Sequence, residues 1–280
     1  METIVKKAVS ITDHLNESYL EVGRDDFKEI CRHLFEDLHA LLRVLFAADE
    51  REKDGVFRVY AVFSVPGADR FTIIVLPIKP EEPRFPSITT LVPAAHWYER
   101  EIRDMFGLEP QGHPDQRRLV FHEAFPAHSH PLRKDWSISA PELSEWGEGE
   151  TIKVAHPFME VSGEGLVEIP VGPVHAGIIE PGHFRFSAVG ETIFFLEPRL
   201  SYTHKGTEKQ FEKLAFSEGV KLAERVSGTS SFAHGAACCM AVERMMGIEI
   251  TEKAAAIRTL VLELERLYNH VGDIHNMCAG

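Results

Sequence analysis

The sequence predicts an α+β protein: a small helix-on-sheet domain first, then a hairpin sheet and a helical bundle. Three observations predict this order. The first half of the 280-residue chain contains a stretch of helical periodicity and two strand-like runs. A segment rich in Ser, Glu, Pro and Gly follows these elements, and the periodicity after residue 207 is helical. The length suffices for two domains of ordinary size.

The N-terminal domain is expected to contain one long helix, from Asp26 to Asp49. Apolar side chains between Phe27 and Leu45 recur there at helical spacing. Asp25 or Asp26 is expected to cap its first turn.

Two strands are expected next, Val56 to Val65 and Arg70 to Ile78, with a hairpin turn at residues 66–69. A short helix is then predicted from Ala94 to Phe106, ending at Gly107. Together with the long helix, these elements make a small α+β domain.

The predicted division of the chain is residues 1–136, a linker at 137–162, and a second domain at 163–280. Ser137 to Gly149 has linker composition. The second domain is expected to begin with strands and continue with helices, of which the last carries one apolar stripe typical of core packing. The expected strands are Glu164–Val174, His183–Val189 and Thr192–Leu196, and the clearest helices are Phe232–Met246 and Glu252–Val271.

Composition excludes several classes of function. The net charge of −13 argues against nonspecific nucleic-acid binding and against docking on anionic lipid. The four cysteines form no C-x-x-C pair and are expected to be reduced thiols. No apolar run is long enough to span a bilayer, so any membrane link is expected to come through partner subunits.

The first motif is the run HWYEREIRDMFG at residues 96–107, followed by GHPDQRR at 112–118 and HPLRKD at 130–135. This combination resembles the 30-kDa subunit family of respiratory complex I, which is its C-type subunit. Ser129 departs from the family pattern, which has glycine there. The resemblance implies a subunit that serves assembly and carries no redox cofactor at this motif.

The charges of this motif are expected to form a partly buried ion-pair network that fixes loops and a docking face. An acid/base site is the alternative. The histidines at 113, 122, 128 and 130 lack a recognised zinc spacing and are expected to be structural. The predicted docking network is Glu99, Arg100, Glu101, Asp104, His113, Asp115, Arg117 and Arg118.

The second half carries another set of motifs: IPVGPVH at 169–175, EPGHFR at 180–185, YTHKGTEK at 202–209, RVSGTSSFAH at 225–234 and ELERLYNH at 263–270. They resemble the large subunit of energy-converting NiFe hydrogenases, of the formate hydrogenlyase and hydrogenase-4 type, and the related 49-kDa, D-type subunit of complex I. Fusion of C-type and D-type halves is typical of this group.

Ser227 and Ser230 stand where the resemblance implies the first pair of metal-binding cysteines. A hydroxyl is far harder to ionise than a thiol and binds soft metals weakly. The family's second cysteine pair lies beyond Gly280, so the domain is also expected to be a truncated form of the large-subunit fold. We therefore expect no metal site and no nickel in this chain. An in-frame continuation to a second cysteine pair would remove the truncation argument and leave the serine argument intact.

Three residues remain as candidates for catalysis. His234 shares a helix face with Cys238, although small-residue packing is the favoured interpretation of that face. His175 matches the first quinone histidine of the 49-kDa subunit, but Ile179 and Leu222 stand where its other quinone residues are expected. Glu180 resembles a proton-relay glutamate by position, or is an exposed turn carboxylate.

The leading function hypothesis is a peripheral subunit of a membrane-associated NADH:quinone oxidoreductase or hydrogenase-related complex. The alternative is a catalytically inactive adaptor or assembly protein of such a complex. We expect this chain to bind no cofactor directly and the iron–sulfur clusters to lie in partner subunits. Binding of a quinone at His175 is the alternative that stays open. Expected partners are an iron–sulfur subunit and membrane subunits, or a second copy of the chain, on the cytoplasmic side of the membrane, and the chain is expected to be soluble when isolated.

Overall fold

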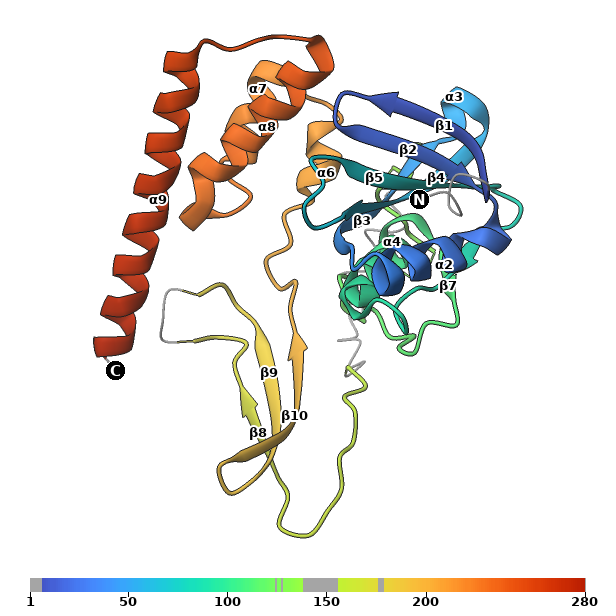
Figure 1. Cartoon of the computed structure of the whole chain (residues 1–280). Helices are drawn as coiled ribbons and strands as arrows, with labels where there is room; N and C mark the ends of the chain where they lie inside the picture. The colour runs from blue at the N-terminus through green and yellow to red at the C-terminus, as the bar shows by residue number, and fades with distance from the viewer. Residues whose placement is uncertain (1–6, 124, 127, 138–155, 176–178, 280) are drawn as a thin grey trace. The chain divides into compact units, whose positions relative to one another are not determined.

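The computed structural model describes residues 7–123, 125–126, 128–137, 156–175 and 179–279, and the chain divides into two compact units, Met1–His204 and Lys205–Gly280 (Figure 1). Each unit is described by itself. The architecture is α+β, as predicted. Most of the predicted linker, residues 138–155, lies outside the described residues, and the predicted domain boundaries stay a prediction.

The first unit is built on a five-stranded sheet in the order β1-β2-β5-β4-β3. β2 pairs with β5 in parallel, and the other neighbours are antiparallel. The predicted hairpin is confirmed as β4 and β5, joined by a turn at residues 65–70. The strands are β1 (Ala8–His14), β2 (Glu17–Val22), β3 (Leu41–Glu50), β4 (Val56–Ser64) and β5 (Phe71–Ile78).

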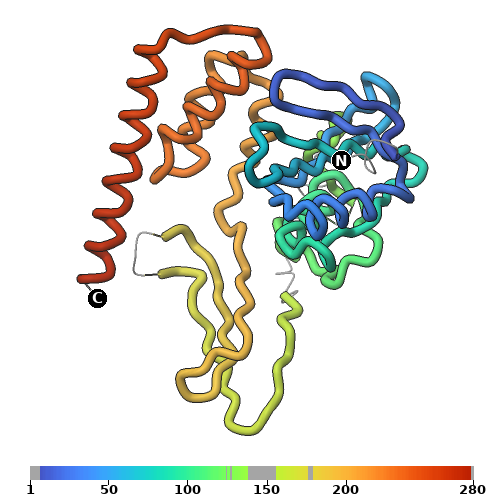
Figure 2. The backbone as a smooth tube through the Cα atoms, viewed as in Figure 1, coloured from blue at the N-terminus to red at the C-terminus, as the bar shows by residue number. Residues whose placement is uncertain are grey.

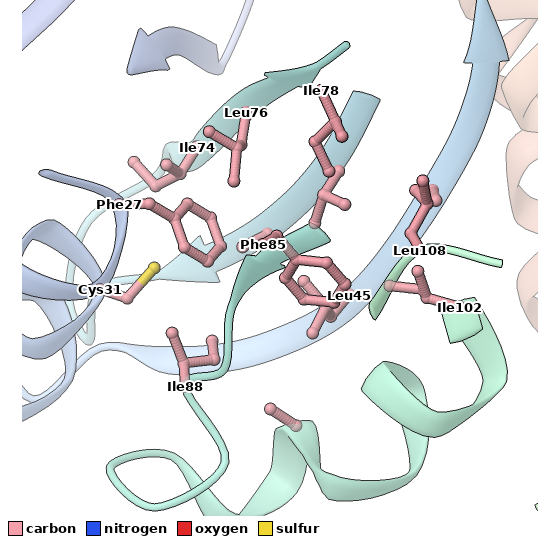
Figure 3. Close-up of a cluster of buried hydrophobic side chains, with 14 of the residues drawn as sticks. Phe27, Cys31, Leu45, Ile74, Leu76, Ile78, Phe85, Ile88, Ile102 and Leu108 are labelled. Atoms are coloured by element: carbon pink, nitrogen blue, oxygen red, sulfur yellow. The ribbon is translucent and has the colours of Figure 1, made fainter. Parts of the chain in front are cut away.

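One face of this sheet is covered by helices and forms the main core. Phe27 and Cys31 of α2 (Arg24–Arg32) lie against Ile74 and Leu76 of β5, and Ile102 of α4 (His96–Phe106) lies near Leu45 and Leu108 (Figure 3). The smaller elements are the π-helical turn η1 (His33–Asp37), α3 (Arg51–Asp54), the 3-10 turn η2 (Pro93–Ala95), and the parallel pair β6 (Arg84–Pro86) and β7 (Glu109–Gln111). α4 ends as predicted at Gly107, which has a left-handed φ of 67°.

The long helix predicted over residues 26–49 is wrong in its second half. The helix ends after Asp37, because His39 adopts a left-handed φ of 52°, and residues from Leu41 onward form strand β3. Apolar residues at 41, 42 and 45 fit a helical period and also a bulged strand, since the register shifts between Leu42 and Val44. The predicted aspartate cap is also wrong. Gly23 is the N-cap and its carbonyl accepts the first N–H bonds, while Asp25 and Asp26 lie inside the first turn.

A second sheet completes the first unit, in the antiparallel order β10-β9-β8. Its strands are β8 (Val167–Val171), β9 (His183–Val189) and β10 (Thr192–Arg199), which confirms the three predicted runs and the turn at Gly190. Figure 2 follows the backbone from the extended segment after residue 156 into this sheet. One face buries Ser187, Glu197 and Arg199.

The second unit is helical, as predicted. Its elements are α6 (Thr207–Phe211), α7 (Phe216–Ala223), the 3-10 turn η3 (Gly228–Ser230), α8 (Ser231–Met246) and α9 (Glu252–Ala279). The apolar stripe of α9 is not packed as core: Leu260 and Leu267 are 60% and 59% exposed. Within the described part of the chain, no helix combines the length and apolar character that crossing a membrane needs.

Candidate functional site

Glu99 of α4 lies at the centre of the C-type motif and is completely buried. Its carboxylate accepts hydrogen bonds from Ser87 Oγ at 2.6 Å, Thr89 Oγ1 at 2.7 Å and the backbone N–H of Ile88 at 2.7 Å. A buried carboxylate needs such donors to offset its lost hydration. Glu99 therefore holds the loop after β6 against the first turn of α4.

Asp104 performs the same task at the other end of α4. Its carboxylate accepts the N–H groups of Leu119 at 3.0 Å and Val120 at 2.9 Å, and its backbone carbonyl lies 2.9 Å from His130 Nδ1. The two carboxylates thus bind backbone and hydroxyl donors more than arginines, which differs from the predicted pairing. Ile88, Leu119 and Val120 lie in loops outside the strands and helices, so their backbone N–H groups need side-chain acceptors.

The arginines of the motif bind backbone carbonyls in turn. Arg100 donates to the carbonyls of Arg117 at 3.1 Å and Arg118 at 3.0 Å, and Arg118 donates to the carbonyl of Phe125. Asp115 is the carboxylate that pairs with arginine, at 3.2 Å from Arg100 and 2.8 Å from Arg117. Burial acts to raise the pKa of Asp115, but the bonds from Arg117 outweigh it and hold that pKa well below the ordinary value. Glu101 lies half-buried on α4.

Three of the four histidines of this region, His113, His122 and His130, contact backbone groups. His113 Nε2 lies 3.1 Å from the carbonyl of His96, while its Nδ1 accepts the N–H of Asp115, and His122 Nε2 lies 3.1 Å from the carbonyl of Leu200. His128 is exposed. Among the described residues, no three His, Cys, Asp or Glu side chains are arranged to hold a metal ion. Ser129, which departs from the family glycine, is buried and accepts the indole N–H of Trp136 at 2.7 Å.

One cluster was not predicted. His156 lies between two carboxylates, with Nδ1 2.7 Å from Glu123 and Nε2 3.2 Å from Glu197. Glu197 of β10 also pairs with Arg117 and accepts the N–H of Met159, and Arg199 donates to the carbonyl of Phe121 at 2.6 Å. These bonds join the C-type motif to the second sheet. His156 falls in the predicted linker, and no spacing in the sequence marks it.

Ser227 and Ser230 lie at the turn that precedes α8, where Ser227 is the N-cap of η3 and Ser230 is its last residue. Ser227 Oγ is 3.2 Å from Thr229 Oγ1, and the N–H of Ser230 donates to the carbonyl of Ser227 at 3.2 Å. Helix α9 holds this turn, because the side chains of Tyr268 and Asn269 donate to the carbonyl of Thr229 at 3.1 and 2.8 Å.

Glu265 of α9 is the buried acceptor at this helix start. It is 5% exposed and accepts the N–H groups of Phe232 at 2.6 Å and Ala233 at 3.0 Å. These are first-turn N–H groups of α8, which otherwise lack partners, and a carboxylate there also suits the helix dipole. Three residues of the motif ELERLYNH, Glu265, Tyr268 and Asn269, thus fix the turn at residues 227–230 and the start of α8.

The remaining candidates are placed as follows. His234 lies half-buried on α8, one turn before the half-buried Cys238, whose pKa is raised by burial. His175 Nε2 lies 2.6 Å from the carbonyl of Gly182, so only Nδ1 is left for a ligand. Glu180 is exposed and accepts a hydrogen bond from Thr203 Oγ1 at 2.9 Å.

Known proteins match both motif sets. Residues 20–142 match the family model described as the respiratory-chain NADH dehydrogenase 30-kDa subunit. Hydrogenase-4 component G of Escherichia coli K12 is 41% identical over 252 residues, which are 89% of this chain and 45% of that protein. The chain is complex I C/D-like. Formate hydrogenlyase subunit 5 of the same organism is 38% identical over 252 residues, 89% of this chain and 44% of that protein.

A third relative carries the C/D name itself. The C/D subunit of the NADH-quinone oxidoreductase of Bacteroides fragilis is 30% identical over 241 residues, 80% of this chain and 45% of that protein. This C/D-like chain thus spans less than half the length of the curated relatives it matches.

Proposed function

We propose that this C/D-like chain is a scaffold subunit in the peripheral part of a membrane-associated respiratory or energy-converting oxidoreductase, and that it holds no nickel–iron centre. The observation that carries the proposal is the pair Ser227 and Ser230 on the turn at the start of α8. The donor chemistry of two hydroxyls does not fit soft metals, which select thiolates.

The turn itself has its own protein partners. The carbonyl of Thr229 receives bonds from Tyr268 and Asn269, and Glu265 caps the helix that follows. Side-chain contacts from α9 thus account for the position of this turn with no contribution from a metal. This supports a chain that retains the large-subunit scaffold at residues 225–234 and places redox chemistry in partners.

The partners that we propose are an iron–sulfur subunit and membrane subunits. The support comes from the relatives, which are named as a hydrogenase component, a formate hydrogenlyase subunit and an NADH-quinone oxidoreductase subunit. A buried charge network that ties loops to α4 gives the C-type region a rigid surface for such contacts.

The test is purification of the tagged chain from detergent-solubilised membranes of its source cell, followed by protein identification and electron paramagnetic resonance of the reduced sample. We expect a co-purifying subunit with iron–sulfur signals. A tagged Asp115→Ala variant is the matched comparison, because loss of the Arg100 and Arg117 pairs should loosen the surface and lower the yield of partners. If partners co-purify but none of them is an iron–sulfur protein, the chain is a catalytically inactive adaptor or assembly protein, and the proposal is overturned.

A further inference from the structure

The open face of the five-stranded sheet, opposite α2 and α4, contains a groove of about 450 Å³. Glu17 is at one end of it, and its other lining residues are Tyr19, Phe46, Tyr60, Val62, Phe71 and Ile73. All lie in the first unit, on strands β2, β3, β4 and β5. None of the interactions described above for the C-type motif uses this face.

The strand register gives the groove an apolar floor. Ile73 lies directly across from Tyr19 on one side and from Val62 on the other. Residues opposite each other in neighbouring strands share a face of the sheet, so these three side chains form one row. Ile73 is 4% exposed, which places it at the bottom of the groove.

Aromatic rings surround this floor. Tyr19 ends the row at β2, and Phe71 lies two residues before Ile73, on the same face. On the opposite side, Tyr60 lies two residues before Val62 and stacks on Phe46, with 5.0 Å between ring centroids and 11° between planes. Phe46 and Phe71 are 43% and 37% exposed, so solvent reaches both side chains.

Carboxylates accompany the rings. Tyr19 Oη donates to Glu17 at 2.7 Å and Tyr60 Oη donates to Glu50 at 2.6 Å, so both hydroxyls orient toward negative charge. Burial, together with Glu50, raises the pKa of Tyr60 and keeps its hydroxyl a neutral donor.

Three arginines near the groove make bonds of their own, and one of them, Arg43, donates to the Oγ of Ser64, the residue that lies opposite Phe71. Arg58 bonds to Glu50 and lies 2.5 Å from Asp54, and Arg70 bonds to Asp13. Glu17 is the one charged residue among those that line the groove. The groove therefore offers ring faces and negative charge, which is the complement of a cation.

From these observations we propose that the groove binds an arginine side chain presented by a partner protein. A guanidinium stacks on aromatic faces more readily than an ammonium does, and Glu17 supplies the opposite charge at the groove end. The apolar floor of Ile73 and Val62 accommodates the aliphatic stem of the arginine and an apolar neighbour in the partner segment. This inference goes beyond the proposed function and does not depend on it.

The test uses the full chain with ¹³C-labelled isoleucine and valine methyl groups and the peptide Ac-Ala-Leu-Arg-Leu-Ala-NH2. We expect saturable shifts of the Ile73 and Val62 methyl signals. The same peptide with citrulline in place of arginine is isosteric and neutral, and we expect its affinity to be about 10-fold lower. Guanidinium chloride tests whether the groove is instead a site for a small molecule, and we expect free guanidinium to bind about 10-fold more weakly than the peptide.

Variants locate the site. Phe46→Leu removes one ring of the stack and should lower the peptide affinity about 10-fold, and Glu17→Gln should lower it about 3-fold. Unchanged methyl signals outside the groove show that each variant is folded. If Phe46→Leu does not fold, Glu17→Gln still tests the site. Equal affinity for the arginine and citrulline peptides, or free guanidinium that binds as tightly as the peptide, would overturn the proposal.

Discussion

The N-terminal body of the first unit and the helical second unit satisfy their apolar and polar groups in different ways. Around the five-stranded sheet, side chains such as Phe27, Phe57 and Phe63 are fully buried, and the buried Glu99 has three donors. In the second unit, the apolar stripe of α9 is more than half exposed at Leu260 and Leu267. The first region is stabilised by its own buried contacts, whereas α9 of the second unit makes polar links to the turn at residues 227–230 and an ion pair from Arg258 to Glu243 of α8.

The largest expected effect is at Glu99. Glu99→Ala removes the buried acceptor for two hydroxyls and one N–H, and we expect the first unit to lose about 4 kcal/mol of unfolding free energy. Chemical denaturation followed by the fluorescence of Trp97 and Trp136 measures this. The exposed Glu109→Ala is the control and should cost less than about 0.5 kcal/mol. Equal losses in both variants would show that Glu99 is not a structural centre.

The next effect is at Asp49, where stability depends on pH. Burial acts to raise its pKa, but hydrogen bonds from Arg51 and from the N–H of Lys134 lower it to about 2, from 3.8. The unfolded chain therefore binds a proton at Asp49 more readily than the folded chain does. The stabilisation by the ionised Asp49 carboxylate is complete above about pH 4 and is lost as the pH falls toward 2. It amounts to about 2 kcal/mol at neutral pH.

Asp49→Asn tests this contribution. The variant should lose about 2 kcal/mol at pH 7 and little at pH 2, so its stability curve should be flatter between these values. Asp69→Asn, on the exposed hairpin turn, is the matched control. A wild-type curve parallel to that of Asp49→Asn between pH 4 and pH 2 would contradict the assignment.

The sequence predicted the main elements after residue 55 but missed the strands β1, β2 and β3 before it. The hairpin, α4, the second sheet and the long helices follow from periodicity and turn residues. β3 was missed because three leucines matched a helical period, while the left-handed residue that ends the helix is His39, which carries no turn signature.

The candidate site was predicted by residue type but not by partner. The motifs identified Glu99, Asp104 and the arginines, yet the pairing with backbone groups depends on loops that spacing does not describe. His156 was missed because its two carboxylates are 33 and 41 residues away in the chain. The role of Glu265 was likewise hidden, because its donors begin a different helix.

A smaller effect is expected at Glu265. Glu265→Ala removes the acceptor for the first N–H groups of α8 and should cost about 1 kcal/mol locally. Hydrogen exchange of the Phe232 and Ala233 amides should become about 5-fold faster, as that free-energy change implies. Glu263→Ala, exposed on the same helix, should leave both rates unchanged. Unchanged exchange in Glu265→Ala would mean that another group fixes this helix start.

The smallest effect on stability is expected for a substitution in the apolar stripe of α9, because this stripe is exposed whereas the core of the first unit is buried. Leu260→Ala should change the stability of the isolated chain by less than about 0.5 kcal/mol, because this side chain is 60% exposed. Leu34→Ala, at a fully buried position, should cost about 3 kcal/mol. A loss at Leu260 as large as the loss at Leu34 would show that the stripe is packed in solution.

The most direct test of the central claim is the metal content of the complex purified from its source membranes after treatment with a chelator. Iron and nickel are measured by mass spectrometry in one sample, so that iron from partner clusters shows the complex to be intact. With Ser227 and Ser230 at the helix start, we predict iron with far less than one nickel per chain. One nickel retained per chain, together with hydrogen uptake, would contradict this claim.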